Sequence, residues 1–306
     1  MKILCLHGQG TSGAIFKSQT GEYKPPFHIW EMSNTIFALC ARHLTIPIHN
    51  SAAFRAKLPP SYTFDFVDAP FPCAPAPGID VLFASAGTYT WWPTPSVSLI
   101  RGSHRRLLDH LAEGGPYDAL CCFSQGCSLA LSFLLYHARE SGSQEPLPFR
   151  SVVFICGGVP FPVLEDLGVG VSERAREVSD ATVRVMKEKA GRLAWAAGNL
   201  GEVRLGRTPG LWDDTSDLVH DPAVMPEEGG DVFGIDFGEV GEELRVGIPT
   251  VHIYGAKDPR WPSSMQLACF CRDRKMFDHG GGHDIPRSTE VSERIAELIR
   301  GLPGGG

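Results

Sequence analysis

The chain has 306 residues, of which 43% are hydrophobic, and its formal net charge is −7 at pH 7. This composition is typical of a globular protein, and the acidic balance argues against non-specific nucleic-acid binding, which needs a basic surface that displaces counterions. No apolar stretch approaches the roughly 20 residues of a membrane span. The apolar run at the N-terminus stops at His7, which is short for a signal peptide, so we expect a cytoplasmic location.

The first half of the chain begins with apolar segments that are rich in β-forming residues, and these predict strands over residues 3–7 and 62–67. A Pro-rich loop with paired tryptophans follows over residues 69–95. Apolar residues at helical spacing then predict a helix over residues 96–111, and a further buried strand is predicted over residues 119–123.

The next elements continue the alternation of helix and strand. A helix is predicted over residues 128–138 and a strand over residues 151–155. Residues 161–246 break the rhythm, because a charged helical pattern near residues 172–192 gives way to an acidic stretch rich in Gly and Pro. A long irregular insertion of this kind is usually a lid or a mobile loop. We therefore interpret residues 161–246 as an inserted cap.

The last part of the chain returns to the pattern, with a predicted strand over residues 250–254, a short strand that ends near Phe277, and a helix over residues 290–300. Strands that alternate with helices predict a doubly wound, mostly parallel sheet that is covered on both faces. We predict a single α/β domain over residues 1–306 with the cap inserted in it.

The cysteines do not predict a disulfide framework. There are nine, which is an odd number, and most lie in apolar strand-like segments, so buried free thiols are expected. Cys269 and Cys271 form a close pair, but no histidine lies near them at the spacing of a zinc site. We expect neither a metal nor a cofactor.

The segment CCFSQG places Ser124 between a predicted strand and a predicted helix. The nucleophile of an α/β-hydrolase occupies such a sharp turn, written G-x-S-x-G, in which the residues two positions away are small. Here those residues are Cys122 and Gly126, so cysteine replaces the first glycine. On this segment alone, Ser124 is either a nucleophile or the N-cap of the helix.

The order of the acidic residue and the histidine that follow Ser124 in the chain favours its role as a nucleophile. A serine hydroxyl needs an adjacent base that is oriented by a carboxylate. Asp258 follows the strand over residues 250–254, and His283 follows a glycine run after the next strand, which is the order Ser, acid, His expected in this fold. We predict Ser124, Asp258 and His283 as the catalytic residues.

Other residues compete for these roles. His279 lies four residues before His283, but the glycines between them indicate a turn that projects the second histidine. Asp284 adjoins the base and cannot easily fold back onto its ring. His252 lies within a strand and is expected to be packed. Cys122 and Cys127 flank the serine and are interpreted as small packing residues.

The oxyanion of an acyl transfer needs two backbone donors. The N–H of Gln125, at the start of the helix, is one candidate. The Gly-rich loop after the first strand, HGQG, offers the N–H of Gln9 or Gly10, and His7 is expected to brace that loop.

Six segments spread over nearly the whole chain resemble a family of fungal serine hydrolases. They are ILCLHGQGTSGAIFKSQT, FDFVDAPF, YTWW, YDALCCFSQGCSLA, IPTVHIYGAKDP and GGGHDIPR. The family includes yeast family-of-serine-hydrolases proteins, human ovarian-cancer-associated protein 2 and polyketide-releasing thioesterases of fungal biosynthetic clusters. The resemblance implies an α/β-hydrolase fold, and it places the family's nucleophile, acid and base on Ser124, Asp258 and His283.

The resemblance also implies a substrate class, which is an acyl ester or thioester. We expect release of a polyketide or related acyl chain from an acyl carrier domain, and the alternatives are a carboxylesterase or a catalytically silent binding protein. Trp91 and Trp92 either line an acyl pocket or pack their loop onto the body. Arg101 and Arg105, with Arg106, either dock an acidic carrier domain or form a solvated helix face.

Overall fold

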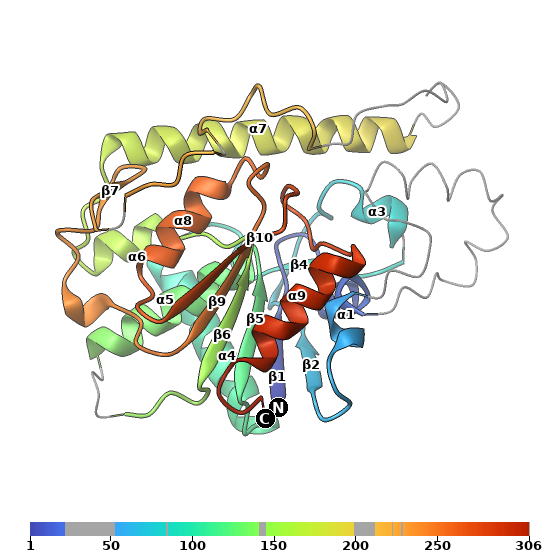
Figure 1. The fold of residues 1–306 in the computed structure, drawn as a ribbon, viewed down its shortest axis with the longest axis horizontal. Helices are drawn as coiled ribbons and strands as arrows, with labels where there is room; N and C mark the ends of the chain where they lie inside the picture. Colours follow the sequence, from blue (N-terminus) through green and yellow to red (C-terminus); the bar gives the residue numbers. More distant parts are fainter. Residues whose placement is uncertain are drawn as a thin grey trace, which may run out of the picture.

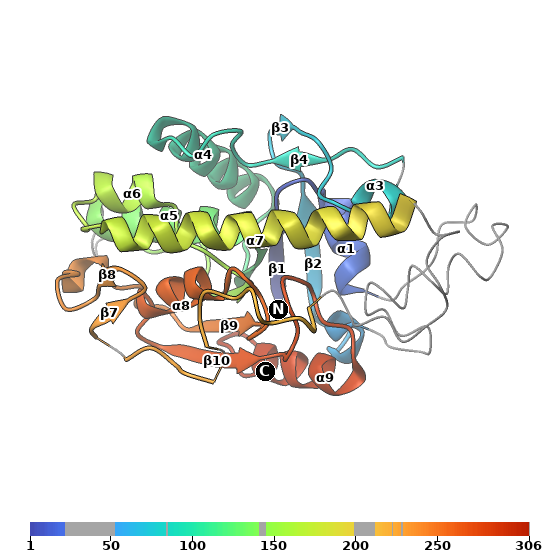
Figure 2. The same cartoon turned by 90° about the horizontal axis from the view of Figure 1, so that it is seen from above.

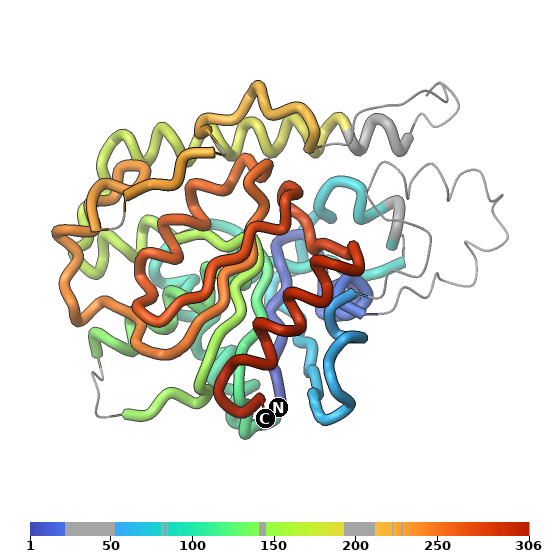
Figure 3. The backbone as a smooth tube through the Cα atoms, viewed as in Figure 1, coloured from blue at the N-terminus to red at the C-terminus, as the bar shows by residue number. Residues whose placement is uncertain are grey.

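The computed structural model describes residues 1–21, 53–83, 85–140, 145–198, 212–221, 223–227 and 229–305 (Figure 3). Cys40 lies outside the described residues, and so do residues 207–211, 222 and 228 of the acidic stretch.

Six parallel strands form the central sheet, in the order β10-β9-β6-β5-β1-β2. Each is a run of five residues, and the four inner strands are apolar and buried as a parallel sheet requires, whereas the two edge strands, β2 and β10, contain charged residues and are partly exposed. Their bounds are Lys2–Leu6 (β1), Thr63–Val67 (β2), Ala119–Phe123 (β5), Ser151–Ile155 (β6), Thr250–Tyr254 (β9) and Arg274–Asp278 (β10). The five strands predicted with both bounds are confirmed to within a residue at each end, and the strand predicted to end near Phe277 is β10, which ends at Asp278.

Helices cover both faces of this sheet (Figure 1). Side chains alternate between the faces, so Leu4 and Cys122 belong to one hydrophobic cluster while Ile3 and Cys121 belong to another. One face is covered by Val97–Gly114 (α4), Gln125–Glu140 (α5) and Trp261–Cys269 (α8), and the other by Gly13–Thr20 (α1), Phe54–Lys57 (η1) and Thr289–Arg300 (α9). The predicted α/β fold with a doubly wound sheet is therefore confirmed.

The strand order reverses direction at β1. The chain passes from β1 outward to β2, and then returns to place β5 on the other side of β1. The loops that leave β1 and β5 therefore diverge, and in open α/β sheets ligands bind in the crevice at such a switch point, outside the carboxyl ends of the strands. Ser124 directly follows β5 at this point.

Residues 161–246 are inserted between β6 and β9, and we call them the insertion. They contain Phe161–Asp166 (α6), Glu173–Gly198 (α7), the two-stranded hairpin Asp231–Val232 (β7) and Ile235–Asp236 (β8), and Glu242–Leu244 (η2). The helix α7 crosses the molecule on the side where β1 ends, as the view from above shows (Figures 1 and 2). A cap has to lie over the carboxyl ends of the strands, and α7 lies on that side of the sheet. That the insertion acts as a cap is a proposal.

The Pro-rich segment 69–95 is more ordered than a plain loop. Phe71–Pro72 (β3) and Tyr89–Thr90 (β4) pair as a short antiparallel ribbon, and Ile79–Leu82 (α3) forms a helical turn between them. Sequence patterns miss such two-residue strands because they offer no periodicity to detect.

Free thiols account for all eight cysteines in the described part of the chain. Among the described residues, no helix combines the length and apolar character needed to cross a membrane.

Candidate active site

Ser124 has a left-handed backbone conformation, with φ of 51°. Non-glycine residues rarely adopt this conformation, and it persists here because the surroundings fix the turn. Ser124 N–H donates to Ile155 O of the neighbouring strand at 3.0 Å, and Ser124 O accepts from Cys127 N–H at 2.9 Å in the first turn of α5. The hydroxyl lies 2.9 Å from His283 Nε2, so it faces that histidine rather than the N–H groups of the helix.

Gly126 permits the close approach of α5 to β1. A side-chain carbon at this position would lie 2.8 Å from Leu6 C and 2.9 Å from His7 O, and closer still to Leu6 O. Such contacts with backbone atoms cannot be relieved by rotating a side chain. Glycine is therefore required at the second small position of the motif.

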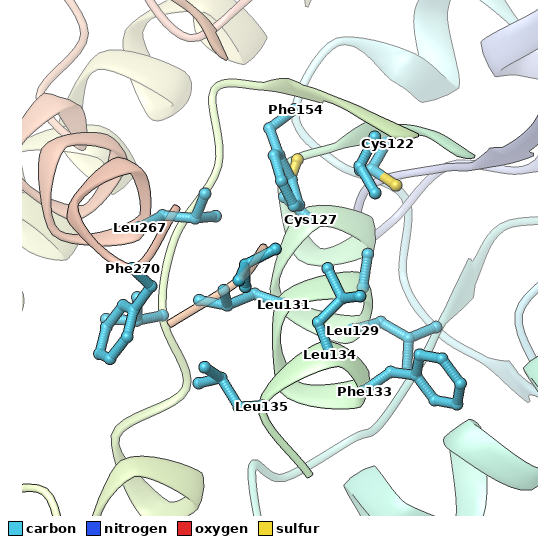
Figure 4. Close-up of a cluster of buried hydrophobic side chains, with 14 of the residues drawn as sticks. Cys122, Cys127, Leu129, Leu131, Phe133, Leu134, Leu135, Phe154, Leu267 and Phe270 are labelled. Atoms are coloured by element: carbon cyan, nitrogen blue, oxygen red, sulfur yellow. The ribbon is translucent and has the colours of Figure 1, made fainter. Parts of the chain in front are cut away.

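The first small position tolerates cysteine because the side chain points into the core. Cys122 and Cys127 are fully buried and lie among apolar side chains of α5 and β6 (Figure 4). Burial raises the pKa of both thiols well above the usual range, so neither is a thiolate at neutral pH. The interpretation of both residues as packing groups is confirmed.

Three loops bring the predicted catalytic side chains into one hydrogen-bonded chain. His283 Nε2 lies 2.9 Å from Ser124 Oγ, and His283 Nδ1 lies 2.8 Å from Asp258 Oδ2. Because a carboxylate can only accept, we assign the ring proton to Nδ1, which leaves Nε2 to accept from the serine hydroxyl. The side chain of Asp258 is 0% exposed and that of His283 is 17% exposed, so the base faces the opening while the acid is enclosed.

The acid and base loops are fixed against each other by their backbones. Lys257 N–H donates to Gly281 O at 3.0 Å, and Asp278 Oδ1 accepts from the N–H groups of Ala256 and Gly280. A side-chain carbon at Gly255 would collide with the Gly281 carbonyl. The glycines therefore allow two loops to touch where Asp258 and His283 must meet.

The second oxygen of Asp258 connects the acid to the insertion. Arg260 N–H donates to Asp258 Oδ1 at 2.7 Å. The guanidinium group of Arg260 donates to Ser179 O at 3.0 Å and to Thr182 Oγ1 at 2.7 Å, both on α7. The role of Arg260 could not be predicted from the sequence, because nothing in the local pattern indicates that its partner is a distant helix.

The competing histidines are packed away from the serine. His279 is buried, accepts from Gly281 N–H at 3.3 Å and lies 4.0 Å from Asp284 Oδ1, so it shapes the base loop. His252 lies 2.9 Å from Thr250 Oγ1, and burial lowers its pKa to about 3. These positions agree with the choice of His283.

The oxyanion prediction needs a correction at Gly10. The N–H of Gly10 already donates to Tyr89 O at 3.0 Å, so it is not free to bind an oxyanion. In the described part of the chain, no hydrogen bond uses the N–H of Gln9 or of Gln125. These two donors remain the candidates, at the ends of the loops that diverge from β1 and β5.

His7 braces the loop, as expected from the sequence. Its Nδ1 lies 2.7 Å from Gly8 O, and its Nε2 accepts from Ala69 N–H at 3.0 Å. Burial lowers the pKa of His7, which favours the neutral ring that these two bonds require.

Trp91 and Trp92 pack against the body, with exposed fractions of 0% and 5%. The Trp91 indole N–H donates to His7 O at 2.9 Å. This is the packing alternative left open by the sequence, and it means that Trp91 does not line an accessible pocket. The physical reason is that a buried indole N–H needs an acceptor, and the end of β1 supplies one.

Gln125 has a second role that the sequence did not reveal. Its Oε1 accepts from Thr90 Oγ1 at 3.0 Å and from Trp91 N–H at 2.9 Å, while its Nε2 donates to Trp92 O at 3.3 Å. The residue after the serine thus fastens the tryptophan segment to the nucleophile turn.

The insertion also contacts the catalytic loops through residues 212–221. Trp212 lies directly against Gly282, next to the base. Lys257 Nζ lies 3.2 Å from Asp213 Oδ1, and the His220 ring stacks on Trp261 with centroids 4.5 Å apart. The described part of the insertion therefore covers the loops that hold Asp258 and His283.

The basic residues of α4 are not equivalent. Arg101 Nη1 lies 2.6 Å from Glu140 Oε1, and its guanidinium group lies 4.4 Å from the centre of the Tyr136 ring. Arg105 and Arg106 are exposed. Arg101 is thus part of the contact between α4 and α5 although its side chain is still 41% exposed, whereas no such contact is seen for the exposed Arg105 and Arg106 among the described residues.

The strand order, together with the strained turn at Ser124 and its hydrogen-bonded histidine, defines an α/β-hydrolase. The chain belongs to the serine hydrolase (FSH1) family, which matches residues 1–295. It is similar to esterase FPY3 of Fusarium mangiferae, with 25% identity over 302 residues that cover 98% of this chain and 95% of the relative. It is also similar to esterase alnB of Emericella nidulans, with 25% identity over 308 residues that cover 94% of this chain and 92% of the relative.

A solved structure, the pyrethroid hydrolase PytH, aligns with 98% of this chain and 98% of its own length at a TM-score of 0.42 and 14% identity. The family membership and the names of the fungal relatives identify the protein as a serine hydrolase of the esterase type.

Proposed function

We propose that the enzyme hydrolyses an acyl thioester and releases a polyketide or related acyl chain from an acyl carrier domain, with Ser124, His283 and Asp258 as its catalytic triad. The observation that carries this proposal is the hydrogen-bonded chain from Ser124 Oγ through the His283 ring to Asp258. The resemblance of the six sequence segments to fungal chain-releasing thioesterases supports the substrate class. The fungal origin of the similar esterases supports it further.

In the first half of the reaction, Ser124 Oγ attacks the acyl carbonyl while His283 Nε2 takes the hydroxyl proton. Asp258 is enclosed and accepts from Nδ1–H, so it fixes the tautomer and stabilises the imidazolium that forms. The carbonyl oxygen becomes an oxyanion, to which the N–H groups of Gln9 and Gln125 donate. Collapse of the tetrahedral intermediate breaks the bond to sulfur, and His283 Nε2–H protonates the leaving thiolate.

In the second half, the acyl group is bound to Ser124 as an ester. His283 Nε2 takes a proton from water, and the resulting hydroxide attacks the same carbonyl. Ser124 Oγ then leaves and recovers its proton from His283. The products are the free acid and the thiol, and these steps use only groups of this chain.

The second candidate is a carboxylesterase that acts on small or medium oxygen esters. It is favoured by the names of the similar fungal proteins, which are esterases. The two candidates share the triad and differ in the leaving group. A thiolate leaves more readily than an alkoxide, so an oxygen esterase depends more strongly on proton donation by His283.

The test compares matched acyl thioesters and oxygen esters of increasing chain length, with wild type measured beside Ser124→Ala. A chain-releasing thioesterase should show Ser124-dependent turnover that favours long or functionalised thioesters. Equal or faster turnover of short oxygen esters would establish the esterase instead. Turnover that survives in Ser124→Ala would contradict both candidates.

The carrier domain would meet the enzyme at a positively charged surface, because carrier domains are commonly acidic. Arg105 and Arg106 are the exposed basic residues of α4. If they contact the carrier, Arg105→Glu with Arg106→Glu should raise KM for a carrier-bound acyl chain and leave turnover of the same acyl group on a small thiol unchanged. If the double variant and wild type had equal KM values for the carrier-bound substrate, Arg105 and Arg106 would not contact the carrier.

A further inference from the structure

Cys156 follows β6 in the same way that Ser124 follows β5. It has a left-handed backbone conformation, with φ of 49°, and its N–H donates to Ile253 O of the next strand at 2.8 Å. Its side chain is buried at the carboxyl edge of the sheet, beneath the base loop. The sulfur lies 3.8 Å from Gly282 O and 3.6 Å from Asp284 O, so it sits against the backbone on both sides of His283.

Three possible metal ligands converge at this point. The sulfur of Cys156, a carboxylate oxygen of Asp258 and a ring nitrogen of His283 all lie within 4.8 Å of one another. They come from the loops after three adjacent strands, β6, β9 and β10. A thiolate, an imidazole and a carboxylate are the three ligand types that zinc uses in proteins, and the ligand atoms around one tetrahedral zinc ion lie about 3.3–3.8 Å apart. Closing the cluster onto an ion therefore needs the longest separation to shrink by about 1 Å, while His283 Nδ1 and Asp258 Oδ2, now 2.8 Å apart, separate by about 0.5 Å as the ion replaces the proton between them.

We propose that Cys156, Asp258 and His283 form an inhibitory site for a thiophilic divalent cation, with Zn²⁺ as the representative ion. The mechanism proposed above assigns no chemical step to Cys156, whose thiol contacts the carbonyl groups on both sides of His283. A hard cation such as Mg²⁺ prefers six oxygen ligands and is not expected to bind.

Binding at this site would stop catalysis through the tautomer of His283. In the active form the ring proton is on Nδ1 and Nε2 accepts from Ser124. A cation on Nδ1 displaces that proton to Nε2, which can then no longer take the proton of the serine. The thiol of Cys156 loses its proton to solvent as the sulfur–metal bond forms. The carboxylate of Asp258 gives up its hydrogen bond from His283 and binds the metal instead. The inhibition rests on the proposed catalytic role of His283, whereas the binding does not.

The binding is measured with Co²⁺ on Ser124→Ala protein, which keeps all three ligands and needs no activity. We expect one ion per chain, a thiolate-to-cobalt charge-transfer band in the near ultraviolet, and displacement of the ion by Zn²⁺. The band should be lost when Cys156→Ser is added and retained when Cys73→Ser is added, since Cys73 lies outside the cluster. A band that persists without Cys156, or no band in the parent protein, would overturn the proposal.

The inhibition is measured on wild type with Zn²⁺ and with Mg²⁺. We expect Zn²⁺ to inhibit reversibly, with recovery on addition of a chelator, and Mg²⁺ to have no effect. Measured against its own turnover without added metal, Cys156→Ser should need at least tenfold more Zn²⁺ for half inhibition, whereas an unchanged Zn²⁺ requirement would contradict the assignment. If Cys156→Ser fails to fold, His283→Ala replaces it in the binding assay, where at least tenfold weaker binding is expected and equal binding refutes the site. Absence of hydrolase activity in wild type would refute the proposed function and leave the cobalt measurement to decide on the metal site.

Discussion

Gly126→Ala is expected to displace Ser124 while leaving the side chains of Ser124, His283 and Asp258 chemically unchanged. The new methyl group would lie 2.8 Å from Leu6 C and 2.9 Å from His7 O, whereas ordinary contacts begin at 3.4 Å. Clearing the nearest atom, Leu6 O, needs a displacement of the start of α5 by about 1 Å, and a misplacement of that size can reduce catalysis about 100-fold.

The stability change has two opposing contributions. Overpacking against rigid backbone costs about 1–3 kcal/mol. Replacing a helical glycine with alanine contributes about 0.5–1 kcal/mol in the other direction. We expect a net loss of about 1–2 kcal/mol in the free energy of unfolding, together with the 100-fold loss in kcat/KM.

The assay measures kcat/KM on a chromogenic ester and the free energy of unfolding in denaturant. Gly191→Ala is the matched control, because it lies in α7 and a side-chain carbon there meets no atom within 4 Å. The control should keep its activity and gain about 0.5–1 kcal/mol. If Gly126→Ala behaved like the control, the close approach of α5 to β1 would not be what places Ser124.

Three further predictions concern the acid, the tryptophan segment and a buried histidine. Asp258→Asn should lower kcat about 10⁴-fold by favouring the wrong tautomer of His283, as measured by steady-state kinetics; a loss below tenfold would remove Asp258 from the triad. Gln125→Ala should cost about 1–3 kcal/mol in thermal or chemical unfolding, because Trp91 N–H loses its acceptor, and Gln125→Glu, which keeps the acceptor, should lie between it and wild type. Burial lowers the pKa of His252 to about 3, so the folded protein holds this ring neutral while the unfolded chain protonates it below about pH 6.5. The free energy of unfolding therefore falls as the pH is lowered from 6.5 towards 3. Wild type should therefore lose about 1.4 kcal/mol per pH unit relative to His252→Gln across that range, and parallel stability curves for the two proteins would show that the histidine is not buried in its neutral form.

Much of the fold could be predicted because the inner strands of its sheet are short, apolar and buried on both faces. Residues 119–123 and 151–155, for example, match β5 and β6 at both ends. The candidate triad was also predictable, since each member lies on the chain within five residues after a strand and the fold brings the carboxyl ends of parallel strands to one edge. This shared edge brings Ser124, Asp258 and His283 near one another, and the contact between the acid and base loops completes their alignment.

The parts that could not be predicted depend on contacts between distant segments. Gly10 looked available in the sequence, but its N–H is used by Tyr89 O, and no pattern reveals that pairing. The same holds for Trp91, whose indole N–H finds His7 O. The link from Arg260 to α7 joins residues that are about 80 positions apart in the chain, beyond the reach of any periodicity.

The central claim is that Ser124 is a nucleophile activated by His283. Its most direct test is covalent labelling with a fluorophosphonate, read out by mass spectrometry of the intact chain and of its peptides. We predict a single adduct on Ser124, no adduct in Ser124→Ala, and labelling slowed by at least 100-fold in His283→Ala, in line with the contribution of a general base. An adduct on another residue, or equal labelling rates in wild type and His283→Ala, would contradict the account.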